Sequence, residues 1–243
     1  MFKNKKRNWQ LSLIGIVAFL LIALTWLGLN NKKARYDKPI MAQEETLGEA
    51  NIFALLHRFS GTNEKINMVI EKLEKDSLNQ SNIENLKSIG ANSKIEVFTA
   101  YASYLEGILN NDNKLLLNSA NLFFEAGTHD PDSMADKTTY SVYAVRACDR
   151  VLKNDPKNLA ALTRKGTAIV YFGGQVMQGV GLLKEAESID SNYIDAQHYL
   201  MLLDLQSGQL EKAKKRLKKL LHLQPENSNY RDILLKLETQ QIK

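Results

Sequence analysis

Four glycines in the stretch "GGQVMQGVG", residues 173–181, are the part of the sequence that most resembles a phosphate-binding loop. Such loops follow a strand and end in Gly-Lys-Ser or Gly-Lys-Thr, whereas this stretch follows a predicted helix and lacks that ending. We therefore interpret Gly173 and Gly174 as the end of a helix and a turn, and Gly179 as a close approach of two helices. Gly181 has no such role, although a glycine inside a helix costs about 1 kcal/mol relative to alanine.

The other side chains that could support catalysis or bind a metal are scattered along the chain. Four histidines form no HExxH pair and have no second ligand at helical spacing: His57, His129, His198 and His222. The single cysteine, Cys148, falls at an apolar position of a predicted helix, which favours a buried thiol over a nucleophile. His129 and Asp130 belong to a helix-ending turn beside Pro131. The sequence therefore predicts no enzyme, no cofactor and no metal site.

The positive charge of the chain is concentrated at its N-terminal end. The 243 residues carry a net charge of +5, but residues 1–39 contain eight Lys or Arg and one acidic residue, so the remainder carries −2. This distribution argues against a nucleic-acid-binding protein. Residues 11–29 are uncharged and long enough as a helix to cross a ~30 Å hydrocarbon core. Trp9 and Trp26 lie near the two ends of this span. Because no Ala-x-Ala site follows it, we predict an uncleaved membrane anchor.

The orientation of the anchor depends on its basic flanks. Basic residues are nearly balanced on the two sides, but a short basic tail usually stays in the cytoplasm. We therefore expect residues 1–10 to be cytoplasmic, residues 30–46 to form a polar tether, and the rest of the chain to lie in the periplasm, held at the inner membrane. An inverted orientation, with the domain facing the cytoplasm, stays open. Cys148 cannot form an internal disulfide and fits either compartment.

Beyond the tether, the hydrophobic pattern is helical almost without interruption. Apolar residues recur at spacings of three and four, as at Ile95, Phe98, Tyr101 and Leu105, and no alternating strand of convincing length is present. The sequence therefore predicts an all-α protein. We expect a degenerate helical part at residues 47–93 and a repeat domain at residues 94–243, closed by a capping helix at about 226–240.

Turn signals divide the repeat domain at nearly regular intervals. Pro156 and Ser191 are 35 residues apart, and Ser191 and Pro225 are 34 residues apart. The interval from Pro131 to Pro156 is only 25 residues, which predicts one long helix at about 135–153 instead of a helix pair. In the expected helix pairs, Gly174 and Gly208 occupy the turns. Small residues fall where paired helices should cross: Ser119, Ala144, Gly179 and Ala213.

This period and these positions resemble the tetratricopeptide repeat family over roughly residues 94–240. The last unit carries the most specific match: Ala213, Leu217, Leu220 and Pro225. Thr163 and Gln197 stand where the family usually has a bulky residue. The resemblance implies antiparallel helix pairs stacked into an α-solenoid. An N-terminal span followed by such repeats is also similar to anchored repeat proteins of the Gram-negative envelope, including the accessory subunit of the Sec translocon. That similarity implies protein partners such as translocon subunits or a periplasmic chaperone.

In this family the first helices of the pairs form a concave surface that binds an extended peptide or a partner's helix. In the register above, the residues that face it are Tyr101, Tyr104, Arg164, Tyr171, Asp195 and His198. Packing inside the domain is the alternative role for these tyrosines. Residues 211–220 concentrate basic side chains, which we interpret as a solvated helix face. The alternative is electrostatic contact with anionic lipid or an acidic partner through Lys214, Lys215 and Lys218.

The sequence thus predicts a membrane-tethered protein-interaction scaffold whose periplasmic repeats bind a partner or an extended client segment, as an accessory of protein export or envelope assembly. Two alternatives stay open. The chain could be a structural subunit of a membrane complex held through its transmembrane helix, or a cytoplasm-facing adaptor. Homo-oligomerisation is also left open.

Overall fold

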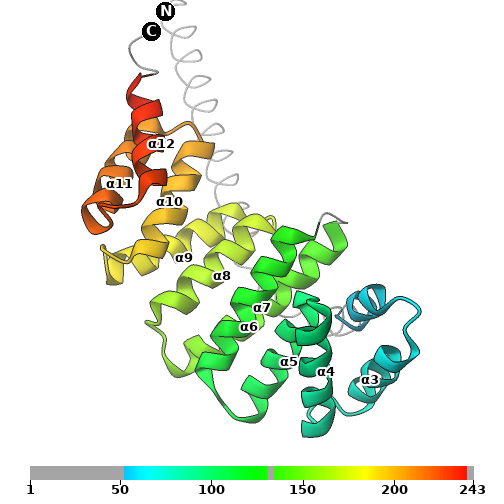
Figure 1. The fold of residues 1–243 in the computed structure, drawn as a ribbon. Coiled ribbons are helices and arrows are strands. Elements are labelled where there is room, and N and C mark those ends of the chain that lie inside the picture. The colour runs from blue at the N-terminus through cyan, green and yellow to red at the C-terminus, as the bar shows by residue number, and fades with distance from the viewer. Residues whose placement is uncertain (1–51, 131–133, 240–243) are drawn as a thin grey trace, which may run out of the picture. The chain divides into compact units, whose positions relative to one another are not determined.

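Helices make up the regular structure of residues 52–130 and 134–239, the parts of the chain that this computed structural model describes (Figure 1). A helical segment at residues 52–60 comes first. The helices that follow are α3 (Glu64–Lys75), α4 (Gln80–Ser93), α5 (Glu96–Leu109), α6 (Asn113–His129), α7 (Met134–Asn154), α8 (Leu159–Tyr171), α9 (Val176–Ile189), α10 (Ile194–Gln206), α11 (Leu210–Leu223) and α12 (Ser228–Thr239). These residues contain no strand, which confirms the predicted all-α class.

The predicted tail, anchor and tether, at residues 1–10, 11–29 and 30–46, lie outside the described residues. Residues 47–51 of the predicted helical N-terminal part lie outside them as well. Within residues 52–130 and 134–239, no helix combines the length and the hydrophobicity needed to cross a bilayer.

Polar side chains and glycines define the helix ends. Asn158 accepts a hydrogen bond from the backbone N–H of Ala161 at 3.0 Å and so caps α8. Gly174 and Gly208 have φ angles of +69° and +72°, a left-handed conformation that a side chain would disfavour. The two glycine turns expected from the sequence are confirmed.

Small residues allow neighbouring helices to cross closely. A Cβ atom at Gly179 would collide with the carbonyl oxygen of Gly166 and lie 2.5 Å from Cγ2 of Val170, so only glycine fits where α9 crosses α8. The Ser119 hydroxyl donates a hydrogen bond of 2.9 Å to the carbonyl oxygen of Ala100 and joins α6 to α5. These contacts confirm the predicted crossing positions at Ser119 and Gly179.

Each helix packs mainly on the helices before and after it, as expected of a helical repeat fold (Figure 1). The helices therefore form an even-numbered and an odd-numbered series, and α8 also contacts its next-but-one neighbours α6 and α10. Among the later helices, α8 pairs with α9 and α10 pairs with α11, whereas α9 and α10 have less contact. The single long helix predicted at about 135–153, between two helix pairs, corresponds to α7.

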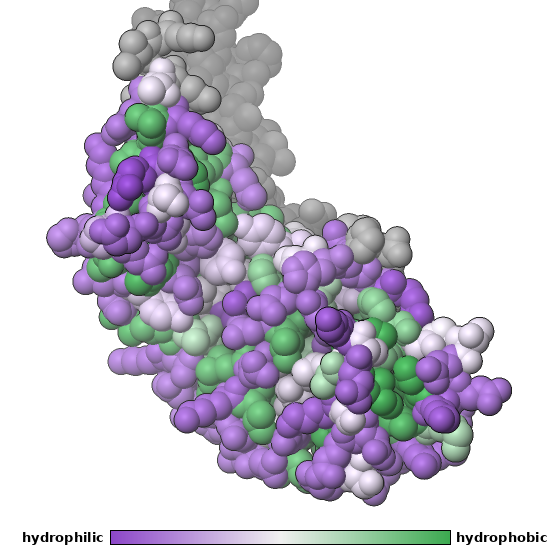
Figure 2. All heavy atoms as spheres, in the orientation of Figure 1, coloured by the Kyte–Doolittle hydropathy of each residue, from purple (hydrophilic) through white to green (hydrophobic). Residues whose placement is uncertain are grey.

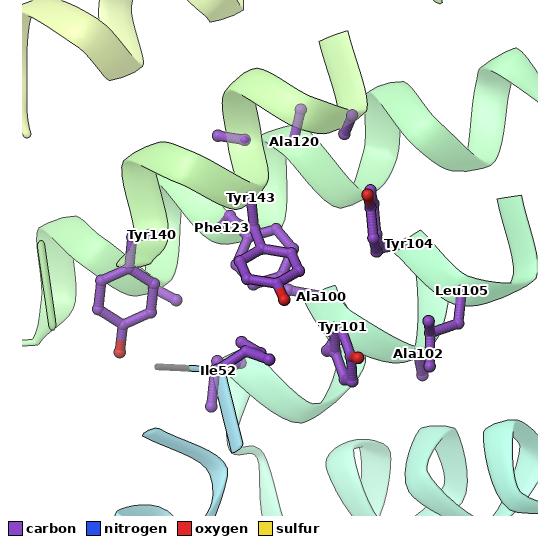
Figure 3. Close-up of a cluster of buried hydrophobic side chains, with 14 of the residues drawn as sticks. Ile52, Ala100, Tyr101, Ala102, Tyr104, Leu105, Ala120, Phe123, Tyr140 and Tyr143 are labelled. Atoms are coloured by element: carbon purple, nitrogen blue, oxygen red, sulfur yellow. The ribbon is translucent and has the colours of Figure 1, made fainter. Parts of the chain in front are cut away.

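The apolar core is divided unevenly along the chain. One large cluster extends from residues 52–60 to α8, and Figure 3 shows Tyr101, Tyr104, Phe123 and Tyr143 packed together within it. A small cluster of Leu162, Ala186 and Ala196 connects α8, α9 and α10. The last cluster belongs to α10, α11 and α12: Met201, Leu217, Leu220, Tyr230 and Leu237.

Candidate functional site

Arg164 on α8 connects three even-numbered helices. Its Nε donates a hydrogen bond of 2.6 Å to Oδ1 of Asn121 on α6. Its guanidinium carbon lies 4.6 Å from the ring centroid of Phe124, also on α6, at a distance suited to a cation–π contact. On the other side, NH1 lies 3.4 Å from the hydroxyl of Tyr199 on α10. Because three contacts hold the side chain, its charge has a defined position on this side of the domain.

Aromatic rings continue from Arg164 across the same helices. Tyr171 lies 5.9 Å from Phe124 and 6.3 Å from Tyr199, measured between ring centroids. Tyr199 is followed by His198 at 5.4 Å, and His198 by Tyr230 of α12 at 5.7 Å. Edge and tilted geometries of this kind are favourable between aromatic rings.

We call this surface the even-helix face, and its residues are Asn121, Phe124, Arg164, Tyr171, Asp195, His198, Tyr199 and Tyr230. Arg164, Tyr171, His198 and Tyr199 are half-buried, Asp195 is exposed, and Phe124 and Tyr230 are buried. The face thus combines rings anchored in the core with polar atoms within reach of solvent. It brings together four of the six predicted binding residues: Arg164, Tyr171, Asp195 and His198.

Burial shifts the pKa values of Tyr171 and His198 toward the uncharged forms. It raises the pKa of Tyr171, and the neighbouring Tyr199 raises it further. Burial lowers the pKa of His198, although the nearby Asp195 carboxylate opposes that shift. The His198 Nδ1 and the Tyr230 hydroxyl lie 3.0 Å apart and share a hydrogen bond. At neutral pH the formal charges of the face are therefore those of Arg164 and Asp195.

Tyr101 and Tyr104 do not belong to this face. Both lie on α5, in the odd-numbered series, and are only 3% and 7% exposed. Tyr143 of α7 packs edge-on against them at 5.6 and 5.4 Å (Figure 3). The structure thus corrects their placement on a partner-binding surface. In the predicted register α7 is a single helix between two helix pairs, so the first helix of a pair is α5 before it and α8 after it.

The basic helix α11 also differs from its predicted interpretation. Lys214 is buried, with its ammonium 3.4 Å from Oε1 of Glu211, so it is not part of a solvated face. Lys218 is exposed and lies 3.6 Å from Oε1 of Glu238 on α12. Lys215 is exposed. The three lysines predicted to act together therefore have different surroundings.

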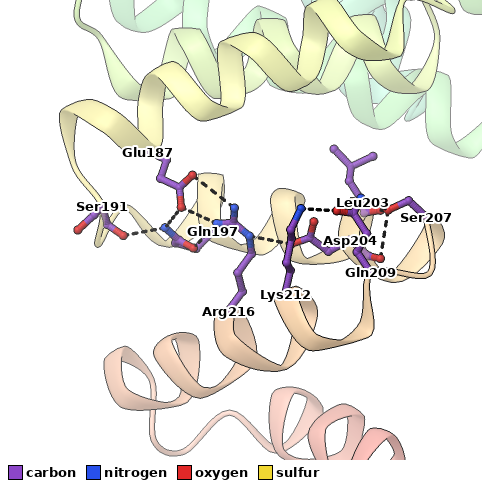
Figure 4. A network of polar contacts seen from close by, with 9 residues as sticks. All are labelled: Glu187, Ser191, Gln197, Leu203, Asp204, Ser207, Gln209, Lys212 and Arg216. Atoms are coloured by element: carbon purple, nitrogen blue, oxygen red, sulfur yellow. Dashed lines mark hydrogen bonds and ion pairs between the residues drawn. The ribbon is translucent and has the colours of Figure 1, made fainter.

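Arg216 of the same helix forms the centre of a polar network (Figure 4). It donates hydrogen bonds to Oε1 of Glu187 on α9 at 2.6 Å, to Oδ2 of Asp204 at 2.9 Å, and to Oε1 of Gln197 at 2.7 Å. Gln197 in turn donates to the Ser191 carbonyl oxygen at 2.8 Å. This network occupies the space between α9 and α10 where apolar contact is sparse. Its signal in the sequence is Gln197, which stands where the repeat usually has a bulky residue.

Other reactive groups of the described residues are not assembled into a chemical site. Residues 52–130 and 134–239 contain no group of three His, Cys, Asp or Glu side chains arranged to hold a metal. Cys148 is fully buried, and burial raises the pKa of its thiol to about 12. His129 contacts only Glu96 among these groups, at 3.0 Å and at an exposed position. The face visible in Figure 2 is mostly hydrophilic, and its hydrophobic residues form small separate groups.

Comparison with known proteins gives limited information. No family model matches the chain, and no curated protein matches it. Among solved structures, the chain is similar to one titled "MamA RS-1 ArsTM double mutant". The two are 15% identical, the match covers 65% of this chain and 92% of that one, and the TM-score is 0.33. The description of the fold as a helical repeat therefore rests on the helix packing itself.

Proposed function

We propose that this chain is a membrane-tethered, non-catalytic scaffold that binds a partner protein on its even-helix face. The observation that carries the proposal is that α8 and α10 present solvent-accessible aromatic and charged side chains on one side, beside buried rings of α6 and α12. In the same proposal, residues 11–29 anchor the chain in the inner membrane and the repeats lie in the periplasm, where they serve protein export or envelope assembly.

The chemistry of the face suits a peptide ligand. Tyrosine rings offer large contact areas at a low cost in conformational entropy, and their hydroxyls can bond to peptide groups. Arg164 and Asp195 supply one charge of each sign to orient the ligand. Contacts at 2.6 Å to Asn121 and 4.6 Å to the ring of Phe124 already order the Arg164 side chain, so binding costs less entropy than ordering a free arginine. Because four successive helices of one series contribute, an extended segment fits better than a compact ligand.

Site-specific photocrosslinking in the full-length protein tests the binding surface. A photoreactive residue replaces Asp195, which is exposed on the even-helix face, and in a matched control it replaces Glu185, which is exposed on α9. In native membranes, we expect the Asp195 position to give discrete protein adducts that Tyr171→Ala weakens. The control position should not give these adducts. Equal adducts from both positions, or none from Asp195, would contradict the proposal.

The tether is tested by replacing residues 11–29 with an unrelated membrane span. The partners recovered in mild detergent should be the same for both forms, because the repeats do the binding. If replacing the original span removes the partners, the chain is instead a structural subunit held through its membrane helix. Adducts with only cytoplasmic proteins would establish the inverted orientation and contradict the periplasmic placement.

A further inference from the structure

A groove with two adjoining pockets is lined by residues of α9, α10 and α11. One pocket has a volume of about 350 Å³ and is lined by Glu187, Gln197, Lys212, Lys215, Arg216 and Lys219. The other, of about 530 Å³, is also lined by Lys212 and Arg216, so the two pockets adjoin at these side chains. We call them together the α9–α11 groove.

One half of the groove carries excess positive charge. Lys212, Lys215 and Lys219 recur at helical spacing along α11 and line the same pocket. Arg216 is recessed, with its side chain 17% exposed, and it is paired with Glu187 and Asp204. None of the three lysines has a carboxylate within 4.0 Å among the described residues. Arg216 balances one of the two carboxylate charges of Glu187 and Asp204. The three lysine charges therefore face a single remaining carboxylate charge.

The other half of the groove mixes polar side chains, such as Lys184, Gln206 and Gln209, with apolar ones. Val180, Leu200 and Leu203 line it, together with two side chains at the start of α9. These two, Val176 and Met177, are 47% and 61% exposed. Large apolar side chains left in water beside a recess are a recognised mark of a contact surface. The groove thus has lysine side chains in one half and apolar contact area in the other, and Lys212 lines both halves.

The lysine half of the α9–α11 groove lies on a different side of α10 from Asp195. At 100° per residue, Asp204 and Gln197 lie about 180° and about 160° from Asp195. Leu203 and Gln206, which line the other half, lie within about 40° of Tyr199. Substitutions of the α11 lysines therefore test the groove without changing the even-helix face.

We propose that the α9–α11 groove binds a segment of a second protein in which acidic side chains lie next to apolar ones. Carboxylates of the segment pair with Lys212, Lys215 and Lys219, and its apolar side chains cover Val176 and Met177. Charge complementarity selects this occupant. A membrane surface fits less well, because the groove also contains the carboxylates of Glu187 and Asp204, which would repel anionic headgroups.

The test uses the full-length protein in mild detergent and a fluorescent peptide in which Glu and Leu alternate. We expect saturable binding that weakens as salt concentration rises. Lys215→Ala with Lys219→Ala, and separately Val176→Ser with Met177→Ser, should each raise the Kd about tenfold. The matched control, Lys65→Ala with Lys72→Ala on α3, removes the same charge elsewhere and should leave the Kd unchanged. A peptide with Ser in place of Leu should bind weakly.

Three results would overturn the proposal. The first is an affinity for the Glu–Leu peptide that does not depend on Lys215 and Lys219. The second is equal loss of affinity in the α3 control, which indicates attraction to net charge alone. The third is competition by glycerophosphoglycerol, the soluble headgroup of phosphatidylglycerol, as strong as that of the peptide, which indicates a lipid site. Crosslinking from Asp195 should be unaffected by the lysine substitutions, so failure here is distinguishable from failure of the proposed scaffold function.

Discussion

At the scale of single residues, two glycines of α9 have different surroundings although they are only two positions apart. Gly179 faces α8, where a Cβ atom would lie 2.5 Å from Cγ2 of Val170 and 3.1 Å from its backbone nitrogen. Gly181 is exposed, and a Cβ atom there would have no neighbour within 4 Å. One glycine is therefore required by the crossing of two helices, and nothing in the surrounding packing requires the other.

Alanine substitution should separate these two cases. We expect Gly179→Ala to lower the free energy of unfolding by about 2–3 kcal/mol, because α9 must move away from α8. Gly181→Ala should raise it by about 1 kcal/mol through helix propensity alone. Urea denaturation followed by circular dichroism measures both. Equal effects of the two substitutions would contradict the close crossing at Gly179.

The thiol of Cys148 should be inert in the folded protein. Burial removes it from solvent and raises its pKa to about 12, so very little reactive thiolate is present at pH 8. Iodoacetamide labelling detected by mass spectrometry should be slow in buffer and fast in urea. His222→Ala, which changes an exposed side chain on α11, serves as the control and should label as slowly as the wild type. Rapid labelling of the folded wild type would show that the thiol is accessible.

At the scale of elements, the polar network of Arg216 replaces apolar packing between α9 and the α10–α11 pair. The Arg216 side chain is 17% exposed, Glu187 is 30% exposed and Asp204 is 13% exposed, so solvent screens the ion pairs only in part. Removing the arginine leaves two carboxylates close together without a cation. The packing of the last helices should therefore depend on this one side chain.

We expect Arg216→Ala to lower the free energy of unfolding by about 2 kcal/mol, below the 3–5 kcal/mol typical of fully buried pairs. Arg150→Ala, at an exposed position of α7, should change it by less than about 0.5 kcal/mol. Urea denaturation of the two variants beside the wild type gives both values. An effect of Arg216→Ala no larger than that of the control would show that the network does not stabilise the domain.

The contribution of Glu187 should depend on pH. Burial alone would raise its pKa, but hydrogen bonds from Arg216 and Gln197 and the surrounding positive charges outweigh burial, so the pKa is lowered from its ordinary 4.5. A carboxyl group with a lowered pKa in the folded state stabilises above its unfolded value, and this stability is lost as pH falls through the folded value. The difference in stability between the wild type and Glu187→Gln should therefore shrink below pH 4.5. Urea denaturation at a series of pH values measures it, and a constant difference would contradict the pairing.

The sequence predicted much of the architecture at this scale, because turns and crossings depend on local residue types. Gly174, Gly208, Ser119 and Gly179 all occupy their expected positions. The side on which a residue lies depends instead on the number of helices that precede it. Tyr101, by contrast, was expected on the binding surface and lies in the core, where it packs against Tyr143 of α7, a residue distant in sequence. The carboxylate partners of Arg216 depend on contacts 12 and 29 residues apart in sequence, and only Gln197 gave a local signal of the network.

At the scale of the whole described domain, the division of the core determines which parts are most stable. The cluster that extends from residues 52–60 to α8 is large, whereas α10, α11 and α12 share a much smaller one. Repeat proteins lack a single cooperative core, so each part depends on its own packing and on its neighbours. Opening of the last three helices should therefore require less free energy than opening of α5 to α8.

Hydrogen exchange followed by mass spectrometry should detect this gradient. Amides of α5, α6 and α8 should exchange at least about tenfold more slowly than those of α10 and α11, because opening the larger cluster costs more. Arg216→Ala should accelerate exchange in α10 and α11 while leaving α5 unchanged, which provides an internal control. Uniform protection from α5 to α11 would indicate one cooperative unit and contradict the division.

The single helix α7 also bears on how such a domain can change its length over generations. Because consecutive helices alternate between two sides, a duplication that adds a pair returns the chain to the side from which it started. Loss or gain of one helix would move every later side chain to the opposite side. Gene duplications that copy pairs can therefore lengthen this protein while preserving both of its surfaces. Because the even-helix face continues from α6 to α8 past α7, gain or loss of one helix at this point would divide that face between the two sides.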